Sequence, residues 1–286
     1  MRKAETTLAW QSKAVLLAVV PWTVASVVLQ AHWWATQVPV VAWTTLGISG
    51  LFGLVVWRLK AATPAGAATG AAITASLIFS TVQFPYRESW LHSGLMPLLA
   101  VFLLTYAATK IGRAKKELLG TAEAKRGRNA AQIAANLGVA ALASTLTAIL
   151  IPQQNLGPIL AVAALAEAAA DTVSSEIGQV FGGAPRMLTT FRKVEAGTDG
   201  AITLTGTAAG IVAAGIVAAI AAWAMGEGWL MAAFCTVGGI AGLIFDSLLG
   251  ATLERQGLLN NDAVNFLSTV AAPIFSVLAI VAWLHK

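Results

Sequence analysis

The sequence is poor in charged residues. Only 11% of its 286 residues are charged, whereas an average soluble domain has roughly 25%. The net charge is +5, but the basic residues stand in short gaps between apolar runs, as they do in the loops of membrane proteins. This composition argues against a soluble protein and against a nucleic-acid partner.

Scarce residues and missing motifs exclude several familiar chemistries. Cys235 is the only cysteine, so the chain can form no internal disulfide or thiolate cluster, and we expect this residue to be a small apolar filler. No segment matches G-x-x-x-x-G-K-[ST], H-E-x-x-H or G-x-S-x-G, which mark P-loop nucleotidases, zinc peptidases and α/β-hydrolases. His32, His92 and His285 lie on the outer side in the topology below, so we expect no histidine-based catalysis there.

Long apolar runs, in contrast, follow one another along the whole chain. Hydrophobic residues make up 57% of the sequence. Because a helix needs about 20 apolar residues to cross a bilayer, we predict an all-α, polytopic transmembrane helix bundle of about nine spans, forming a single membrane domain over 1–286. Gly206 with Gly210, and Gly238 with Gly242, predict close approaches between helices. The predicted spans are 14–30, 38–57, 64–84, 91–109, 130–151, 157–180, 201–224, 229–252 and 263–284.

The basic residues also indicate the orientation. With the N-terminus cytoplasmic, all of the 18 lysines and arginines except Arg87 and Lys286 fall on the inner side, as the positive-inside rule requires. The C-terminus is then outside. The first apolar run has no convincing cleavage site, so we expect a transmembrane helix and not a signal peptide. We expect a bacterial-type inner membrane, with the polar surface facing the cytoplasm.

Acidic residues stand where a plain spanning helix does not need them. Glu167, Asp171, Glu176 and Asp246 lie within or beside apolar runs, although a charge near the bilayer centre costs roughly 2.5–3.5 kcal/mol. The acids could pair with basic loop residues, which is the favoured interpretation for Glu167, or could form a proton or ion pathway. Alternatively Asp171, Glu176 and Asp246 bind Mg²⁺, which takes carboxylate oxygens together with substrate phosphates.

Two predicted inner loops have the composition of a phosphate site. The segment 110–128, KIGRAKKELLGTAEAKRGR, is basic, and the segment 182–200, GGAPRMLTTFRKVEAGTDG, joins paired threonines and basic residues to a Gly-flanked Thr198-Asp199. Glycine-rich turns let backbone N–H groups approach a phosphate, and hydroxyl and basic side chains complete an anion site. Attraction to anionic lipids would also explain basic loops.

A third inner cluster, LNNDAVNF at residues 259–266, precedes the last span. It places Asn261 and Asn265 one helical turn apart, with Asp262 beside them. Either these residues bind a ligand, or Asn260 or Asn261 caps the helix.

These segments occur in the same order in a known membrane family. GRAKKELLG and AEAKRGRNAAQIAAN are followed by ADTVSSEIG, PRMLTTFRKVEAGTDG, FDSLLGATLERQ and LNNDAVNFLS. The series resembles the integral-membrane family that includes the phytyl-phosphate kinases, and it is distantly similar to dolichol kinases and lipid cytidylyltransferases. Residues 1–105 match only as hydrophobic spans, so 106–286 is expected to be the catalytic part. Ala196 and Ala201 stand where the family usually has proline and glycine.

The resemblance implies a CTP-dependent polyprenyl-phosphate kinase that converts phytyl or geranylgeranyl phosphate into the diphosphate. CTP is then the phosphoryl donor, Mg²⁺ the cofactor, and membrane lipids and the prenyl phosphate the partners, with an oligomer possible. The implied catalytic residues are Asp171, Asp246, Lys115 and Arg128. The implied nucleotide- or phosphate-binding residues are Lys116, Asn136, Ser175, Arg186, Thr189, Thr190, Lys193, Gly197, Thr198, Asp199, Gly200, Ser247, Asn261 and Asn265.

Two other functions remain open. The intramembrane Glu167 and Asp171 would also suit a transporter or flippase of an anionic lipid, which would consume no nucleotide. A lipid cytidylyltransferase would release pyrophosphate where a kinase releases CDP.

Overall fold

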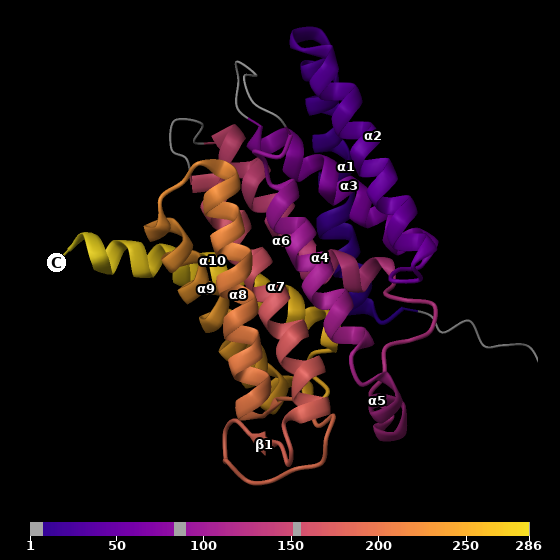
Figure 1. Ribbon diagram of the computed structural model, residues 1–286, viewed down its shortest axis with the longest axis vertical. Helices are drawn as coiled ribbons and strands as arrows, with labels where there is room; N and C mark the ends of the chain where they lie inside the picture. Colours follow the sequence, from indigo (N-terminus) through magenta and orange to yellow (C-terminus); the bar gives the residue numbers. More distant parts are fainter. Residues whose placement is uncertain (1–7, 83–89, 151–155, 286) are drawn as a thin grey trace, which may run out of the picture.

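The computed structural model describes residues 8–82, 90–150 and 156–285, and Figure 1 shows them as a bundle of helices. Besides the α-helices, the secondary structure within these ranges consists of a two-stranded antiparallel hairpin and one π-helical turn, η1. The elements are α1 (Trp10–Gln37), α2 (Pro39–Arg58), α3 (Pro64–Thr81), α4 (Leu95–Lys110), α5 (Arg113–Leu119), α6 (Ala130–Leu150), α7 (Leu156–Phe181), β1 (Arg186–Met187), β2 (Ala201–Ile202), α8 (Leu204–Met225), α9 (Trp229–Leu249), η1 (Gly250–Glu254) and α10 (Asn261–Leu284).

The helices follow the predicted spans. Within the described ranges seven helices are long and apolar enough to cross a membrane, or eight if α4 and α5, which meet at 66°, form one bent span. The helix α3, over the segment rich in alanine, glycine and threonine, is not among them. The all-α membrane bundle is therefore confirmed, while the prediction of about nine spans is approximate.

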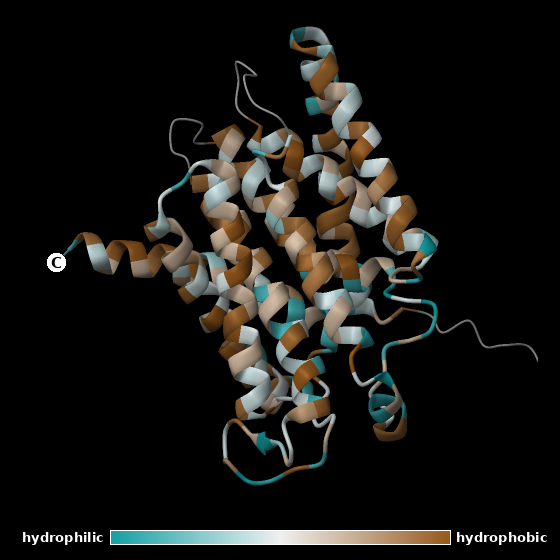
Figure 2. Ribbon diagram, in the orientation of Figure 1, coloured by the Kyte–Doolittle hydropathy of each residue, from teal (hydrophilic) through white to brown (hydrophobic). Residues whose placement is uncertain are grey.

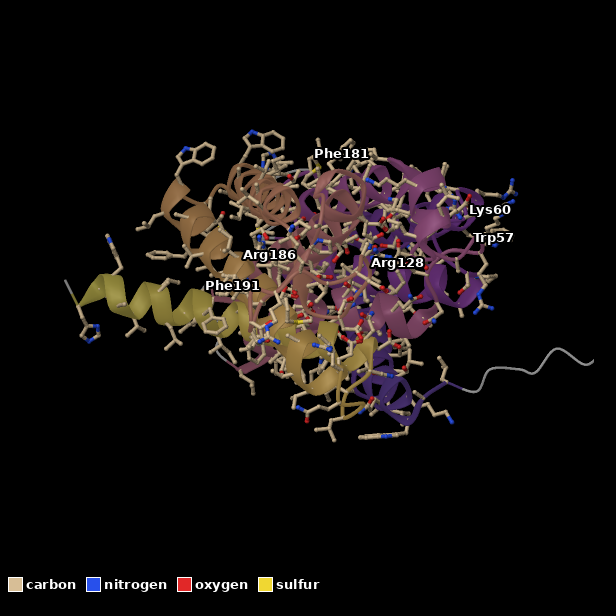
Figure 3. All side chains as sticks on the ribbon, turned by 90° about the horizontal axis from the view of Figure 1, so that it is seen from below. Trp57, Lys60, Arg128, Phe181, Arg186 and Phe191 are labelled. Atoms are coloured by element: carbon tan, nitrogen blue, oxygen red, sulfur yellow. The ribbon has the colours of Figure 1, made fainter. Side chains whose placement is uncertain are left out.

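Polar residues gather at one end of the bundle. Figure 2 shows hydrophilic residues around α5 and the β1–β2 hairpin, while the helices above them are mainly hydrophobic. We call this end, formed by α5, the 120–129 loop, the hairpin and the start of α10, the polar end. Arg2, Lys3, Arg87 and Lys286, which entered the charge argument, lie outside the described residues. The cytoplasmic orientation and the side of the C-terminus stay predictions. Figures 1 and 3 show the C-terminal part of α10 extending away from the bundle.

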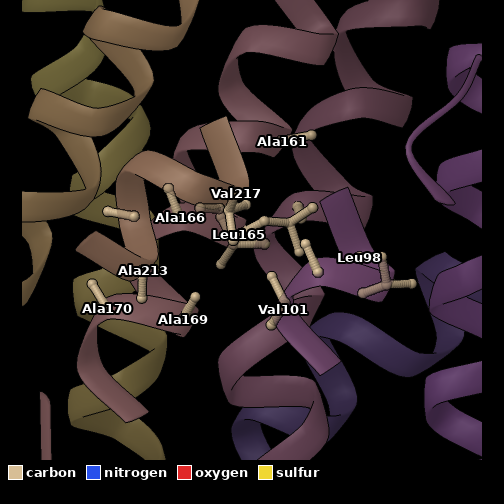
Figure 4. Close-up of a cluster of buried hydrophobic side chains, with 14 of the residues drawn as sticks. Leu98, Val101, Ala161, Leu165, Ala166, Ala169, Ala170, Ala213 and Val217 are labelled. Atoms are coloured by element: carbon tan, nitrogen blue, oxygen red, sulfur yellow. The ribbon is translucent and has the colours of Figure 1, made fainter. Parts of the chain in front are cut away.

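The centre of the bundle is α7. It packs against α4, α6, α8, α9 and α10, and 72% of its most apolar stretch is buried, compared with 22% for α1 at the periphery. Its alanines let neighbouring helices approach, and the core around Leu165 combines them with Leu98, Val101 and Val217 (Figure 4). The acidic residues of α7 are therefore carried by the helix with least access to lipid.

Glycines form the predicted close helix contacts. A Cβ atom on Gly206 of α8 would lie 2.5 Å from the Ser174 carbonyl oxygen of α7. A Cβ atom on Gly210 would lie 2.7 Å from the Ala170 carbonyl oxygen of the same helix. A Cβ on Gly242 of α9 would lie 2.5 Å from Glu167 Cγ. Since real Cβ atoms do not approach so closely, these positions require glycine, and the packing prediction is confirmed.

Candidate active site

A polar cavity of about 330 Å³ opens at the polar end. Its walls come from α6, α7, the end of α9 with η1, the start of α10, and the loop 196–203. We call it the polar cavity. The structure brings together here the predicted site residues Arg128, Asn136, Asp171, Ser175, Glu176, Gly197, Thr198, Asp199, Gly200, Asp246, Ser247, Asn261 and Asn265.

The α6 wall begins with a reciprocal cap. Asn129 Oδ1 accepts hydrogen bonds from the backbone N–H groups of Ala131 (2.8 Å) and Gln132 (3.0 Å), and Gln132 Oε1 accepts one from the Asn129 N–H (2.8 Å). This capping box fixes where the helix starts. Gln132 and Asn136, one turn apart, then both face the polar cavity.

Backbone contacts to the turn between α2 and α3 hold Arg128 in place. Its N–H donates to the Ala61 carbonyl oxygen at 2.9 Å. Gly127 has φ +79°, and a Cβ there would lie 2.4 Å from the Ala61 carbonyl carbon, so glycine permits this approach. The guanidinium donates from Nη2 to Thr172 Oγ1 (3.3 Å), and Nε lies 3.7 Å from Glu123 Oε2. In Figure 3, which looks onto the polar end, Arg128 lies toward the middle of the bundle.

Asp171 from α7 and Asp246 from α9 provide carboxylates from two sides of the cavity. Both side chains line the polar cavity. Asp246 Oδ2 is buried and has no hydrogen-bond partner among the described residues. An orphaned carboxylate oxygen costs free energy unless a cation or a donor meets it. Asp246 therefore has an oxygen free for a ligand.

Glu167 lies about two and a half helical turns farther from the polar end than Glu176 and does not line the polar cavity. It is 1% exposed, and its Oε1 also lacks a hydrogen-bond partner in the part of the chain that the structure describes. Among the described lysines and arginines none forms an ion pair with it, so the predicted pairing of Glu167 with a basic loop residue is not seen in that part of the chain.

The loop 196–203 docks through glycine. Gly200 has φ +71°, and a Cβ there would lie 2.0 Å from the Ala251 N atom. Gly250 meets the same loop, since its Cβ would lie 2.7 Å from the Gly200 N atom. Thr203 closes the segment by accepting from the Gly206 N–H at 3.0 Å, which caps α8. The backbone from Gly197 to Gly200 is thereby held at the cavity wall.

At the start of α10, one residue caps the helix and others line the polar cavity. Asn260 is the cap, because its Oδ1 accepts from the Ala263 N–H at 3.0 Å. Ser12 of α1 donates to Asp262 Oδ2 at 2.6 Å, so that aspartate is a packing residue. Asn261 and Asn265 remain turned to the polar cavity. The sequence had left the capping residue open between Asn260 and Asn261.

The predicted metal ligands Asp171, Glu176 and Asp246 all line the polar cavity, but the three do not converge on one point. Glu176 Oε2 is 2.6 Å from the Nζ of Lys116, and its Oε1 accepts from Thr109 Oγ1 at 2.9 Å. Across the described ranges, no three His, Cys, Asp or Glu side chains converge as a metal site. Glu176 thus lines the cavity with both oxygens already occupied by protein partners.

Six of the predicted site residues lie away from the cavity. Lys116 is 1% exposed and donates to Glu176 and to the carbonyl oxygens of Ala108 and Thr109. Lys115 donates to the Val180 carbonyl oxygen at 2.6 Å, on the outside of the bundle. These two lysines fix α5 to α4 and α7, and neither lines the polar cavity. The remaining residues lie on the surface of the hairpin segment: Arg186, Thr189, Thr190 and Lys193.

Glu254 is a cavity residue that the sequence reasoning missed. It lies eight residues after Asp246, a spacing that returns to the same helix face. It belongs to η1, whose wider turns are typical of functional positions. Among the described residues that line the polar cavity, one is basic, Arg128, and six are acidic: Glu123, Asp171, Glu176, Asp199, Asp246 and Glu254.

This excess of negative charge bears on the predicted cofactor. Lys116 pairs with Glu176 and Arg128 lies near Glu123, but Asp171, Asp199, Asp246 and Glu254 form no ion pair among the described residues, and such a cavity repels a free nucleotide phosphate. Mg²⁺ needs only one or two carboxylates when phosphates supply its other ligands. The open oxygen of Asp246 and the neighbouring Asp171 fit such an ion.

The chain is similar to membrane proteins of archaea, cyanobacteria and plants. The family described as Integral membrane protein DUF92 matches residues 47–273, which include the whole polar cavity. The uncharacterized membrane protein MJ0933 of Methanocaldococcus jannaschii is 38% identical over 186 residues, 64% of this chain and 75% of that protein. The uncharacterized membrane protein sll0875 of Synechocystis is 32% identical over 62% of this chain and 69% of its own length. Protein VTE6, chloroplastic, of Arabidopsis thaliana is 29% identical over 72% of this chain and 63% of its own length. No solved structure gives a significant match.

Proposed function

The chain belongs to the integral membrane protein family DUF92, and from this membership and the polar cavity we propose that it is a CTP-dependent polyprenyl-phosphate kinase. The membership confirms the family resemblance drawn from the motifs, a family that includes the phytyl-phosphate kinases. The acceptor is a prenyl monophosphate, and the product is the diphosphate. We propose that the reaction takes place at the polar end, on the cytoplasmic side.

One observation carries this proposal: an acidic cavity faces a glycine loop and a single arginine within a membrane bundle. Such a cavity accepts phosphate groups only together with a divalent cation, as in nucleotide-dependent phosphoryl transfer. Asp171 and Asp246 would hold Mg²⁺, which would offset negative charge on the donor phosphates and stabilise the charge that develops on the leaving group.

The chain's own residues would position the two substrates. The backbone from Gly197 to Gly200 would approach the nucleotide phosphates, as glycine-rich turns do. Asn261 and Asn265 can donate to phosphate or nucleotide oxygens. Arg128, preorganised by its backbone, would hold the acceptor phosphate, for which a guanidinium fork is well suited.

The reaction needs no general base. The acceptor phosphate is already an anionic nucleophile, so its oxygen attacks the γ-phosphorus of the donor while the bond to the β-phosphate oxygen breaks. The products are the prenyl diphosphate and CDP, and no atoms are left over. The main barrier is to bring two anions into line, which positioning and positive charge lower.

The proposal is tested by following the nucleotide product. The purified protein in lipid nanodiscs is incubated with Mg²⁺, CTP and geranylgeranyl or phytyl phosphate, with ATP, GTP and UTP as competing donors. We expect CDP and prenyl diphosphate in equal amounts. Pyrophosphate with a CDP-lipid would identify a cytidylyltransferase instead, and lipid movement in proteoliposomes without nucleotide consumption would identify a transporter. Either result overturns the kinase.

A further inference from the structure

A second, apolar cavity lies beside the polar cavity. It has a volume of about 90 Å³ and is bounded by α2, α3, α4 and α6. Most of its wall is aliphatic or aromatic, with Phe52, Phe102, Tyr106 and Ile133 among the lining residues. We call it the apolar slot. The glycine loop 196–203 and the start of α10 do not line it.

Aromatic residues form the outer wall of the slot, and small residues form its inner wall. The helices α2 and α4 pack on α3 and α7 respectively, and they meet across the slot through Phe52 and Phe102, whose rings stand edge to face with centroids 5.4 Å apart. Tyr106 stacks on Phe102 at 5.6 Å. On the inner side α3 presents Gly70, where a Cβ would meet only Ile133 Cγ2, at 3.9 Å. Small residues on α3 thus leave room where aromatic residues of α2 and α4 close it.

The mouth of the slot is basic. Lys60, Lys110, Arg113 and Arg128 line it together with one acid, Glu123. Lys60 lies at the periphery of the bundle and Arg128 lies toward the middle (Figure 3). A basic mouth on an apolar slot complements an amphiphile with an anionic head.

The slot and the polar cavity meet at three shared residues: Glu123, Arg128 and Asn136. A phosphate bound at Arg128 would therefore face the polar cavity on one side, while the apolar tail attached to it would lie in the slot on the other. The Arg128 backbone fixes this junction, because it pairs with the turn that joins α2 to α3.

We propose that the apolar slot holds the head-proximal part of a single-chain isoprenoid phosphate, with its phosphate at Arg128 and its tail leaving toward lipid beside the Phe52–Phe102 pair of α2 and α4. This proposal rests on the proposed function for the identity of the phosphate as acceptor. A space of about 90 Å³ suffices for on the order of one isoprene unit. The remaining units lie in the bilayer, so the slot selects the head and the first unit, and tolerates different chain lengths.

The first test needs no nucleotide and no variant. Geranylgeranyl phosphate with a diazirine in its first isoprene unit is photolysed with the wild-type protein in nanodiscs, and labelled peptides are identified by mass spectrometry. We expect the label on α2, α3 or α4 around Phe52, Gly70 and Phe102. Unlabelled geranylgeranyl phosphate should compete, whereas inorganic phosphate or geranylgeraniol at the same concentration should compete at least about tenfold less well, because each satisfies only half of the site. Label on α8, α9 or α10 overturns the slot.

The second test fills the slot. Gly70→Leu should raise KM for geranylgeranyl phosphate about tenfold, with kcat and the KM for CTP little changed, because the side chain occupies the space of the first isoprene unit. Gly50→Leu on α2 is the matched control, because a Cβ there would lie in open space and the residue does not line the slot, so KM should stay within about twofold. An unchanged KM in a folded Gly70→Leu protein overturns the slot, and if that variant does not fold, the labelling result decides.

The two proposals fail in different ways. Label in the slot without any CDP formation would leave the lipid site standing and remove the kinase. CDP formation with the label elsewhere would keep the kinase and remove the slot.

Discussion

The buried ion pair between Lys116 and Glu176 gives the most quantitative prediction. The two charges are 2.6 Å apart, and Lys116 also donates to the carbonyl oxygens of Ala108 and Thr109, which ties α5 to α4 and α7. Lys116→Met removes the ammonium and leaves the carboxylate buried with only the Thr109 hydroxyl as donor. Breaking a buried pair in this way costs roughly 3–5 kcal/mol.

The assay is thermal unfolding of the detergent-solubilised protein. For a chain of this size about 2–4 °C is lost per kcal/mol, so Lys116→Met should lower Tm by on the order of 10 °C. The double variant Lys116→Met with Glu176→Leu removes both charges and should recover most of that loss, because apolar replacement of a whole buried pair is often neutral. If Lys116→Met is as stable as the wild type, or if the double variant is less stable than Lys116→Met, the ion pair does not stabilise the fold.

Three further substitutions test the packing, the loop and the cap. Gly210→Ala should destabilise the protein by about 1–3 kcal/mol in thermal unfolding, because its Cβ would press on a backbone carbonyl, whereas Gly215→Ala, in open space on the same helix, should be neutral or stabilising; equal effects would contradict the packing. Gly200→Ala should abolish turnover while membrane insertion, measured by fractionation, is retained; normal turnover would remove the loop from the site. Asn260→Ala should cost about 1 kcal/mol of stability through the lost cap, and Asn261→Ala should instead raise the KM for CTP; the reverse assignment would refute the division at α10.

The sequence predicts the helices because lipid imposes their length and composition. The span α8 has no charged residue along its whole length, and the four-residue spacing of Gly206 with Gly210, and of Gly238 with Gly242, indicates close helix packing. Asp171 and Asp246 could also be predicted, because a carboxylate within an apolar run is costly unless it has a function. In each case a local pattern has one dominant physical explanation.

The partners of charged residues could not be predicted in the same way. Lys115 and Lys116 are neighbours in a basic segment of the sequence. The turn at Gly112, with φ +61°, starts the helix α5, in which Lys116 points inward to Glu176, 60 positions away. Nor does composition tell that the threonines and basic residues of the hairpin segment, Arg186 to Lys193, lie on its surface while the following glycines dock at the cavity. Such pairings depend on tertiary contacts that no local pattern contains.

The reaction proposed for the polar cavity is phosphoryl transfer to a prenyl phosphate. The most direct measurement is the transfer of ³²P from γ-labelled CTP to geranylgeranyl phosphate in nanodiscs, with and without Mg²⁺, for the wild type, Asp171→Asn and Asp246→Asn. We predict labelled geranylgeranyl diphosphate only with Mg²⁺ and the wild type, and a loss of about 100-fold or more in each variant while both remain inserted in the membrane. Undiminished transfer in both variants, or no labelled diphosphate from the wild type with any prenyl monophosphate, would contradict the claim.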